Sequence, residues 1–590
     1  MRLKTFLMTV ALTLNAVPLT PVAADNVALK NIPAQLGPNA RAQYREIFED
    51  IHASRWSAAL NRLCAMPEGP LHNVARAEIY LGKRSPKVEG SALGELLAKA
   101  PELPEATALS RLATARGAVL LPNIPSEQDL NWLGSAPRRG HTSAAEDSAR
   151  AGVAGRIIGY IKTDQPAAAE AFLDANSGSL NIDSLTEMRQ RVAWSYYITG
   201  DDTAARALAA KAHDGSGEWA AQADWIAGLA AWRQRDYTNA ASMFLFTAQK
   251  AHNPELSAAG SFWAARAAVN ANAPHAVSQY LRAAATKTET FYGLLAQNAL
   301  GMKVQTVDDP TLVRIPAVEA LPNVRAALAL AEIGENKLAD SLIRHQAKIG
   351  DGRDHAALAL LAGRLDLPHT QLWLAQNGPS GAVASVAARY PAPERWQPEG
   401  GWRVDRSLVY AHILEESRFQ ANVTSPAGAR GLMQVMPSTA SAIARHRGLT
   451  LGSLYSPNVN MNYGQIFIEK VRDMPETGGM LPKVIAAYNA GTAPIAVWNA
   501  KAGDGADPLL YIESIPYWET RAYVMTVMRN YWMYQQQSGE ATHSMAALAQ
   551  GMWPRFPGMS GAAAVRIEPV NRLASADVHN SPNNAAKTGD

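Results

Sequence analysis

The sequence predicts an all-α protein that opens with an α-superhelical solenoid of helix–turn–helix repeats. Residues from about 25 to 290 are rich in Ala, Leu, Glu, Gln and Arg, which favour helices, and few runs alternate as strands do. The same region carries a faint internal repeat of about 35 residues, the length of a tetratricopeptide-like unit. A chain of 590 residues exceeds a single hydrophobic core, and two clusters of prolines mark where it divides.

The N-terminus has the layout of a secretory signal peptide. Residues 1–4 are basic, residues 6–17 are apolar and uncharged, and small residues precede a cleavage position after Ala24. The alternative is an N-terminal anchor helix, but the apolar run is shorter than the ~20 residues that a membrane span needs. No cysteine directly follows the cleavage position and no later run is apolar enough to cross a bilayer. We therefore expect an exported chain with no stable membrane insertion after cleavage.

The repeat units each consist of an aromatic apolar run, a short break and an alanine-rich run. They occupy residues 193–208, 228–244 and 263–280. At the start of the second unit and just before it, Trp225, Leu229 and Trp232 are spaced four and three apart, so they share one face of a helix. We interpret these tryptophans as core between stacked helices, with stacking against a sugar as the alternative interpretation. Units of this kind stack into a curved solenoid.

Proline-rich stretches at 308–322 and 390–401 interrupt the helical pattern, and after about residue 545 the pattern decays into a polar end. The predicted division is a signal peptide at 1–24, a solenoid at 25–290, a helical middle domain at 291–388, a C-terminal domain at 389–545 and a disordered tail at 546–590.

Charge and cysteine content exclude several classes of function. The net charge is only +3, so nothing indicates a nucleic-acid partner. Cys64 is the single cysteine, which rules out an internal disulfide and a cysteine-rich metal site. The 13 histidines show no ligand spacing with carboxylates, so we expect neither a metal nor a cofactor.

One carboxylate has the setting of a general acid. A helix is expected from Val404 to about Ser417, and Val409, Ile413 and Glu416 share one of its faces. A carboxyl on an apolar face near a helix C-terminus favours its protonated form, which suits proton donation to a glycosidic oxygen. The alternative, which the spacing alone favours, is two solvated glutamates, Glu415 and Glu416, at a helix end.

Four segments in order change that balance. Glu416-Ser417 is followed by Gly-Leu-Met-Gln at 431–434, by Ala-Tyr-Asn at 487–489 and by Ile-Pro-Tyr-Trp-Glu-Thr-Arg at 515–521. Their order and spacing resemble the soluble lytic transglycosylases, the Slt-type family of lysozyme-like murein enzymes. Weaker similarity to the long members of that family extends over 262–266 and 291–296. The resemblance implies that the middle domain is a helical linker and that 389–545 is a lysozyme-like catalytic domain.

The resemblance also implies roles for individual residues. Glu416 matches the single catalytic acid and base of the family, whereas Glu415 stands at a position that is not catalytic. Six further residues match positions that contact or frame the substrate: Ser417, Gln434, Met436, Tyr488, Asn489 and Glu519. Each of these six has a purely structural role as its alternative.

The implied function is that of a periplasmic enzyme of a Gram-negative bacterium acting on the glycan strands of peptidoglycan. It would cleave the β-1,4 bond between N-acetylmuramic acid and N-acetylglucosamine without water, leaving 1,6-anhydromuramic acid ends. The long members imply an exo-acting lyase, although the residues themselves do not distinguish attack at chain ends from attack in mid-strand. Protein partners are not indicated. The alternatives are a hydrolytic muramidase and a non-catalytic wall-binding scaffold.

Overall fold

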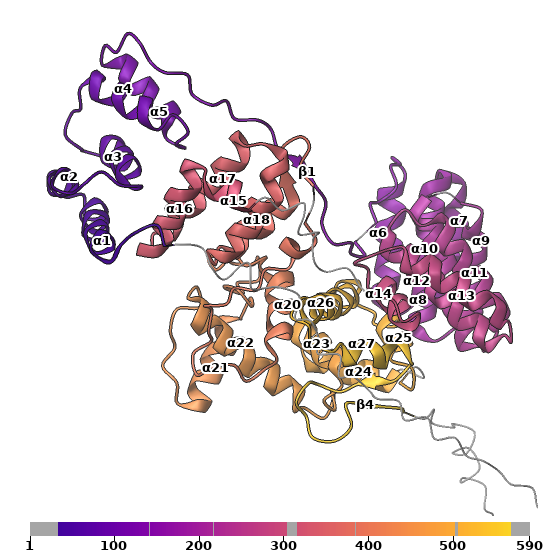
Figure 1. Cartoon of the computed structure of the whole chain (residues 1–590). Coiled ribbons are helices and arrows are strands. Elements are labelled where there is room, and N and C mark those ends of the chain that lie inside the picture. Colours follow the sequence, from indigo (N-terminus) through magenta and orange to yellow (C-terminus); the bar gives the residue numbers. More distant parts are fainter. Residues whose placement is uncertain are drawn as a thin grey trace, which may run out of the picture.

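The computed structural model describes residues 34–140, 142–215, 217–303, 315–383, 385–501 and 505–567. In these ranges the chain forms 27 α-helices and a few short 3-10 helices, and the strands are four two-residue segments (Figure 1). The predicted all-α class is confirmed. The predicted signal peptide lies outside the described residues. None of the described helices combines the length and apolarity that crossing a membrane requires.

The predicted repeats are consecutive helix pairs of one solenoid, in which each helix packs on the next (Figure 1). Its members are α6 (Arg150–Lys162), α7 (Pro166–Asn176), α8 (Ile182–Thr199), α9 (Asp202–His213), α10 (Gly217–Arg233), α11 (Tyr237–Lys250), α12 (Pro254–Asn270), α13 (Pro274–Ala285) and α14 (Phe291–Ala299). Polar caps fix several of the helix starts: the Asn181, Asp201 and Asn253 side chains accept backbone N–H groups of the first turn.

Small residues and tryptophans together make the core of this solenoid. A Cβ on Gly260 would lie 2.6 Å from the carbonyl oxygen of Phe244, so only glycine lets α12 approach α11 this closely. Trp225 and Trp263 are buried, and their ring centroids lie 6.0 Å apart. The core interpretation is confirmed for these two, whereas Trp194 and Trp232 are only partly buried and pack against the core.

A second group of helices forms a separate core. It joins α1 (Pro38–His52), α2 (Trp56–Ala65), α3 (His72–Leu81), α4 (Gly90–Lys99) and α5 (Ala106–Ala115) to α15 (Ile315–Glu319), α16 (Pro322–Ile333), α17 (Asn336–Ile349), α18 (His355–Arg364) and α19 (Pro368–Gln376). The first five helices therefore share their core with the expected middle domain and not with α6–α14. The division into domains otherwise stays a prediction.

An extended strap, residues 116–149, connects these two groups and ends the helical run because it contains Pro122, Pro125 and Pro137. Within it, β1 (Asn131–Trp132) pairs antiparallel with β2 (Asn377–Gly378). The strap then passes the C-terminal domain, where Arg529 donates a hydrogen bond to the carbonyl oxygen of Pro137.

The C-terminal domain is built around the contact of α20 with α26 and packs on the solenoid through α14 (Figure 1). Its helices are α20 (Arg406–Glu416), α21 (Pro437–Arg447), α22 (Pro457–Arg472), α23 (Leu481–Ala490), α24 (Thr492–Lys501), α25 (Pro508–Glu513), α26 (Trp518–Gln537) and α27 (His543–Ala549). One continuous core includes residues of this domain and of α6–α14.

The prediction of a disordered tail from 546 is wrong for residues 546–567. They complete α27 and form the antiparallel pair β3 (Trp553–Pro554) and β4 (Ala564–Val565). Trp553 and Phe556 are buried, so this segment has the apolar side chains that anchor it to the domain. The polar end beyond 567 lies outside the described residues.

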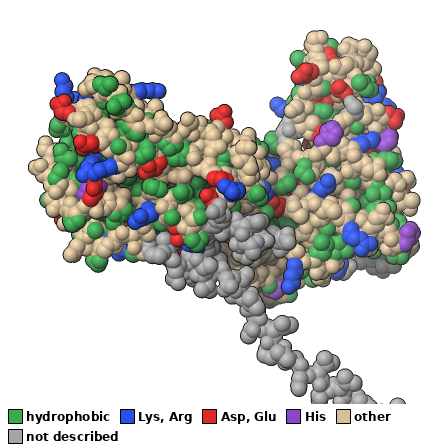
Figure 2. Space-filling view, turned by 45° about the horizontal axis from the view of Figure 1, so that its top comes forward, with side chains coloured by type: hydrophobic (Ala, Val, Ile, Leu, Met, Phe, Trp, Pro, Cys, Tyr) green, Lys and Arg blue, Asp and Glu red, His purple; other side chains and the backbone are tan. Residues whose placement is uncertain are grey.

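Buried polar contacts fix the C-terminal domain against the solenoid. The Glu513 carboxylate is fully buried, pairs with Arg139 of the strap at 2.6 Å and accepts the Tyr292 hydroxyl at 2.7 Å. Arg266 of α12 pairs with Asp507 at 2.7 Å. These directional contacts hold the two parts in one orientation. The face in Figure 2 shows acidic and basic side chains interspersed, as the small net charge suggests.

Candidate active site

Glu416 is the last residue of α20 and stands where the chain turns sharply. The helix starts at Asp405, whose side chain accepts the Ser407 N–H at 2.8 Å. It ends because Arg418 and Phe419 adopt φ angles of 50° and 62°, in the left-handed region that a helix cannot continue through. The preceding residues of α20, from Ser407 to Ile413, are buried, so the helix presents its final carboxylate from a rigid support.

The environment of Glu416 favours its protonated form. Burial, reinforced by the negative charges of Glu415 and Glu519, raises the pKa of Glu416 to about 7. Tyr523 of α26 opposes this shift, since its hydroxyl donates to Glu416 Oε1 at 2.6 Å and stabilises the carboxylate. The carboxyl thus has the balance that a group needs to act as an acid and then as a base near neutral pH.

His412 completes a chain of hydrogen bonds behind the acid. Its Nδ1 lies 2.8 Å from the Tyr523 hydroxyl, and burial lowers the pKa of His412 to about 3. The ring is therefore neutral. Because the single Tyr523 hydroxyl proton is engaged by Glu416, the His412 ring must donate from Nδ1 to the hydroxyl oxygen. The histidine thereby orients the tyrosine that orients the acid.

Sequence reasoning did not assign His412 or Tyr523 to the site. A signal exists for both, because His412 precedes Glu416 by one helical turn and Tyr523 follows Glu519 by one turn. These pairs place each residue on the same helix face as a residue that the motifs had already marked.

Tyr488 lies next to this chain of hydrogen bonds. Its ring centroid is 4.6 Å from that of His412, and its hydroxyl donates to the carbonyl oxygen of Met433 at 2.8 Å. Burial, followed by the charge of Glu416, raises the pKa of Tyr488 well above its usual range. The tyrosine therefore stays neutral and ties α23 to the loop that follows α20.

That loop holds Gln434 and Met436. Gln434 has a φ of 46°, and its side-chain amide donates to the Gly431 carbonyl at 2.7 Å. Met436 caps the start of α21 and its side chain is exposed. Gly431 has a φ of 74°, and a Cβ there would lie 2.1 Å from the carbonyl oxygen of Leu454. The loop is thus closely fitted to the domain, with Met436 facing outward.

Ser417 has a structural contact in addition to its position beside the acid. It is buried, and its hydroxyl donates at 3.2 Å to the Ile413 carbonyl, which also accepts the backbone N–H of Ser417.

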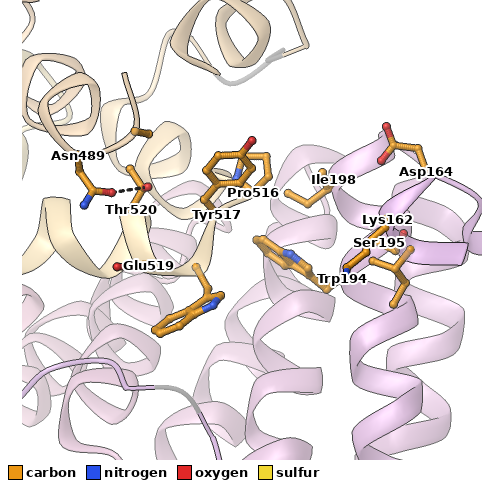
Figure 3. Close-up of a pocket in the computed structure, with 13 residues that line it drawn as sticks. Lys162, Asp164, Trp194, Ser195, Ile198, Asn489, Pro516, Tyr517, Glu519 and Thr520 are labelled. Atoms are coloured by element: carbon orange, nitrogen blue, oxygen red, sulfur yellow. Dashed lines mark hydrogen bonds between the residues drawn. The ribbon is translucent and has the colours of Figure 1, made fainter. Parts of the chain in front are cut away.

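Asn489 and Glu519 meet on the side of the site that faces the solenoid (Figure 3). The Thr520 hydroxyl donates to Asn489 Oδ1 at 2.7 Å, which joins the end of α23 to the start of α26. Glu519 is exposed in the first turn of α26, where a negative charge is favourable.

Glu415, the neighbour of Glu416 in the chain, is engaged in an ion pair. Arg138 of the strap lies 3.0 Å from its Oε1. Burial raises the pKa of Glu415, and the charge of Arg138 acts in the opposite direction. Among the described residues, no group of His, Cys, Asp or Glu side chains is placed to hold a metal ion. The structure therefore gathers Glu416, Tyr523, His412 and Tyr488 around one point, with two further carboxylates near them.

Comparison with known proteins gives a family for this domain. Residues 397–510 match the model of the transglycosylase SLT domain. The soluble lytic murein transglycosylase of Salmonella typhimurium is 32% identical over 161 residues, which are 26% of this chain and 24% of that protein. That of Escherichia coli K12 is 31% identical over 155 residues, with the same shares. These alignments span about a quarter of the length of the curated relatives.

Two solved structures resemble the chain over most of its length. The 70 kDa soluble lytic transglycosylase Slt70 from Escherichia coli is 16% identical, with 88% of this chain and 99% of that chain covered and a TM-score of 0.48. An inactive mutant of the lytic transglycosylase Slt from Pseudomonas aeruginosa is 19% identical, with 84% and 86% covered and the same TM-score. The resemblance that the motifs indicated is confirmed over residues 397–510, which match the transglycosylase SLT domain family.

Proposed function

We propose that this protein is a peptidoglycan lytic transglycosylase in which Glu416 serves as general acid and then as general base. The observation that carries the proposal is the setting of Glu416: a carboxyl with a pKa of about 7, hydrogen-bonded to Tyr523, inside a transglycosylase SLT domain. The relatives named above are murein transglycosylases, which makes the β-1,4 bond between N-acetylmuramic acid and N-acetylglucosamine the proposed target.

In the first half of the reaction, protonated Glu416 donates its proton to the glycosidic oxygen. The bond from C1 of muramic acid to this oxygen breaks, and positive charge develops at C1. Burial supplies the protonated form near neutral pH. The N-acetyl oxygen of the same sugar stabilises the charge, as in the substrate-assisted glycosidases.

In the second half, the ionised Glu416 takes the proton of the C6 hydroxyl, and O6 of the same sugar bonds to C1. The Tyr523 hydrogen bond stabilises the carboxylate that exists between these two steps. The tethered hydroxyl has the advantage of proximity over water. The product is a 1,6-anhydromuramic acid end, and Glu416 regains its proton.

Neither neighbouring carboxylate is suited to be an enzymic nucleophile. Glu415 is engaged by Arg138, and Glu519 stands exposed on the solenoid side. This supports the non-hydrolytic route over the two-carboxylate scheme of a muramidase. The proposed compartment is the periplasm, to which a signal peptide at 1–24 would direct the chain.

Mass analysis of products from purified murein in ¹⁸O-labelled water tests this function. We expect anhydromuramic ends, lighter than reducing ends by one water and free of label. Reducing ends that carry ¹⁸O would make the enzyme a muramidase, and intact murein would leave only a wall-binding scaffold.

A further inference from the structure

A cavity of about 760 Å³ lies between the solenoid and the C-terminal domain (Figure 3). Lys162, Trp194 and Ile198 line it from α6 and α8, and Asn489, Tyr517 and Glu519 line it from the opposite side. Neither part of the chain would form it alone. Its volume is in the range of pockets that hold small organic ligands, about 300–1,000 Å³.

We propose that this cavity is a saccharide subsite, which binds a sugar of the glycan strand beyond the bond being cleaved, and that α8 of the solenoid forms half of it. The proposal rests on the function proposed above and adds the solenoid to the substrate-binding surface.

Aromatic side chains line the cavity from both sides. Trp194 of α8 is only partly buried and borders the cavity. Its ring is fixed, because it stacks on Tyr197 at 5.4 Å with an interplanar angle of 29° and carries the Arg521 guanidinium 4.2 Å from its centroid. Tyr517 faces it and is 55% exposed. The exposed ring of Tyr517, beside the part of Trp194 that borders the cavity, indicates a ligand with apolar faces, such as a sugar ring.

The cavity lies beside the residues around Glu416. Asn489 directly follows Tyr488, and Glu519 is near enough to Glu416 for its charge to act on that carboxyl. A strand that occupies the site at Glu416 can therefore continue into the cavity. Hydrogen bonds fix the separation of the two walls: Ser514 lies 2.9 Å from the Tyr197 hydroxyl and accepts Arg233 at 3.0 Å.

The charges that line the cavity favour a neutral ligand. The stem peptides of murein are rich in carboxylates, so a peptide site would need an excess of cations. The cavity offers one ammonium, Lys162, against two carboxylates, Asp164 and Glu519. This lining disfavours an acidic peptide and suits the neutral hydroxyl and acetamido groups of a sugar, which can both donate and accept hydrogen bonds.

Calorimetry with peptide-free N-acetylglucosamine oligomers tests the subsite. The full chain carrying Glu416→Gln is the parent, so the ligand stays intact. We expect the hexamer to bind it more tightly than the trimer. The added substitution Trp194→Leu keeps an apolar side chain but removes the aromatic ring. It should weaken binding of the hexamer about fivefold, because one aromatic contact is lost, and leave binding of the trimer unchanged.

Two further variants guard against a trivial result. Tyr517→Ala alters the opposite wall at an exposed position and should give the same length-dependent loss, even if Trp194→Leu disturbs the packing against Arg521. Ile182→Ala is the control, because Ile182 is 59% exposed on the same helix α8 and does not line the cavity. It should bind both oligomers as the parent does.

The outcomes separate the two proposals. A parent that binds no oligomer would overturn the proposed function and the subsite together. A parent that binds trimer and hexamer equally well, or variants that weaken both alike, would overturn the subsite alone. Variants that weaken only peptide-bearing murein fragments would show a peptide site and contradict a saccharide one.

Discussion

At the scale of single residues, two opposing influences set the pKa of Glu416: burial raises it and one hydrogen bond lowers it. Burial holds a proton on Glu416, and Tyr523 supports the carboxylate that remains when the proton leaves. An acid that must become a base within one catalytic cycle needs both influences. A neutral His412 fixes Tyr523 in turn. The protonation state of Glu416 therefore depends on three residues from two helices.

Removing the Tyr523 hydroxyl tests this balance. Without the donor, Tyr523→Phe should raise the pKa of Glu416, so the alkaline fall of kcat/KM should move to higher pH. The intermediate carboxylate loses a hydrogen bond to a charged group, worth about 1.5–3 kcal/mol, so turnover should fall roughly 10- to 100-fold. A pH–rate profile on soluble murein fragments checks both effects. If turnover fell but the alkaline limb of the pH–rate profile stayed at the same pH, the hydroxyl would have only a packing role.

Glu415 affects the pKa of its neighbour through charge. Glu415→Gln removes one of the negative charges that favour the protonated form of Glu416. The pKa of Glu416 should fall, and because the reaction starts from the protonated acid, activity should decline at a lower pH than in the wild type. The same pH–rate profile measures the shift. An alkaline limb that moves upward would contradict the assigned direction.

At the scale of elements, the motifs lie at helix ends and loops that the fold brings together. The end of α20, the loop before α21, the end of α23 and the start of α26 all meet around Glu416, as the order of motifs led us to expect. Short-range patterns predict such positions because each motif is local. Arg138 could not be predicted in this way, since it lies in a strap without a motif and reaches Glu415 only through the folded arrangement.

The loop before α21 offers a matched pair of glycines. Gly431→Ala should be severely destabilising, because its φ is 74° and the new Cβ would meet the Leu454 carbonyl oxygen at 2.1 Å. Gly428→Ala has a φ of 90° but nothing within 4 Å, so it should cost only about 1 kcal/mol of backbone strain. Thermal unfolding of both variants checks the difference. Equal midpoints would mean that the loop does not fit against the domain as described.

At the scale of the whole molecule, helical periodicity predicts that each helix has an apolar face but not which partner covers it. The all-α class and the solenoid pairs were accessible because neighbours in sequence pack together. The shared core of α1–α5 with α15–α19 was not, because its members are separated by the whole solenoid. The ordered end of the C-terminal domain was missed because its two buried aromatics, Trp553 and Phe556, stand among glycines and prolines without a helical period.

The contact between solenoid and C-terminal domain should contribute to the stability of the whole. Arg139→Ala leaves the fully buried Glu513 without its cation, which should cost about 3–5 kcal/mol of unfolding free energy. Arg206→Ala is the control, because the two side chains of its pair with Asp236 are 30% and 32% exposed, and such a pair should be worth less than about 1 kcal/mol. Denaturant unfolding of the full chain compares them. Similar losses of unfolding free energy in the two variants would contradict a fixed contact between the solenoid and the C-terminal domain.

The identity of the acid is the central claim, and turnover of purified murein sacculi by Glu416→Gln, beside Glu415→Gln, tests it most directly. The first variant keeps the size of the side chain but has no proton to donate, so activity should fall at least ~10²–10⁴-fold while the thermal midpoint is retained. At its own optimal pH, the second should stay within about tenfold of the wild type, since Glu415 acts on the site only through its charge. Retained activity in Glu416→Gln, or the larger loss in Glu415→Gln, would contradict the assignment of Glu416.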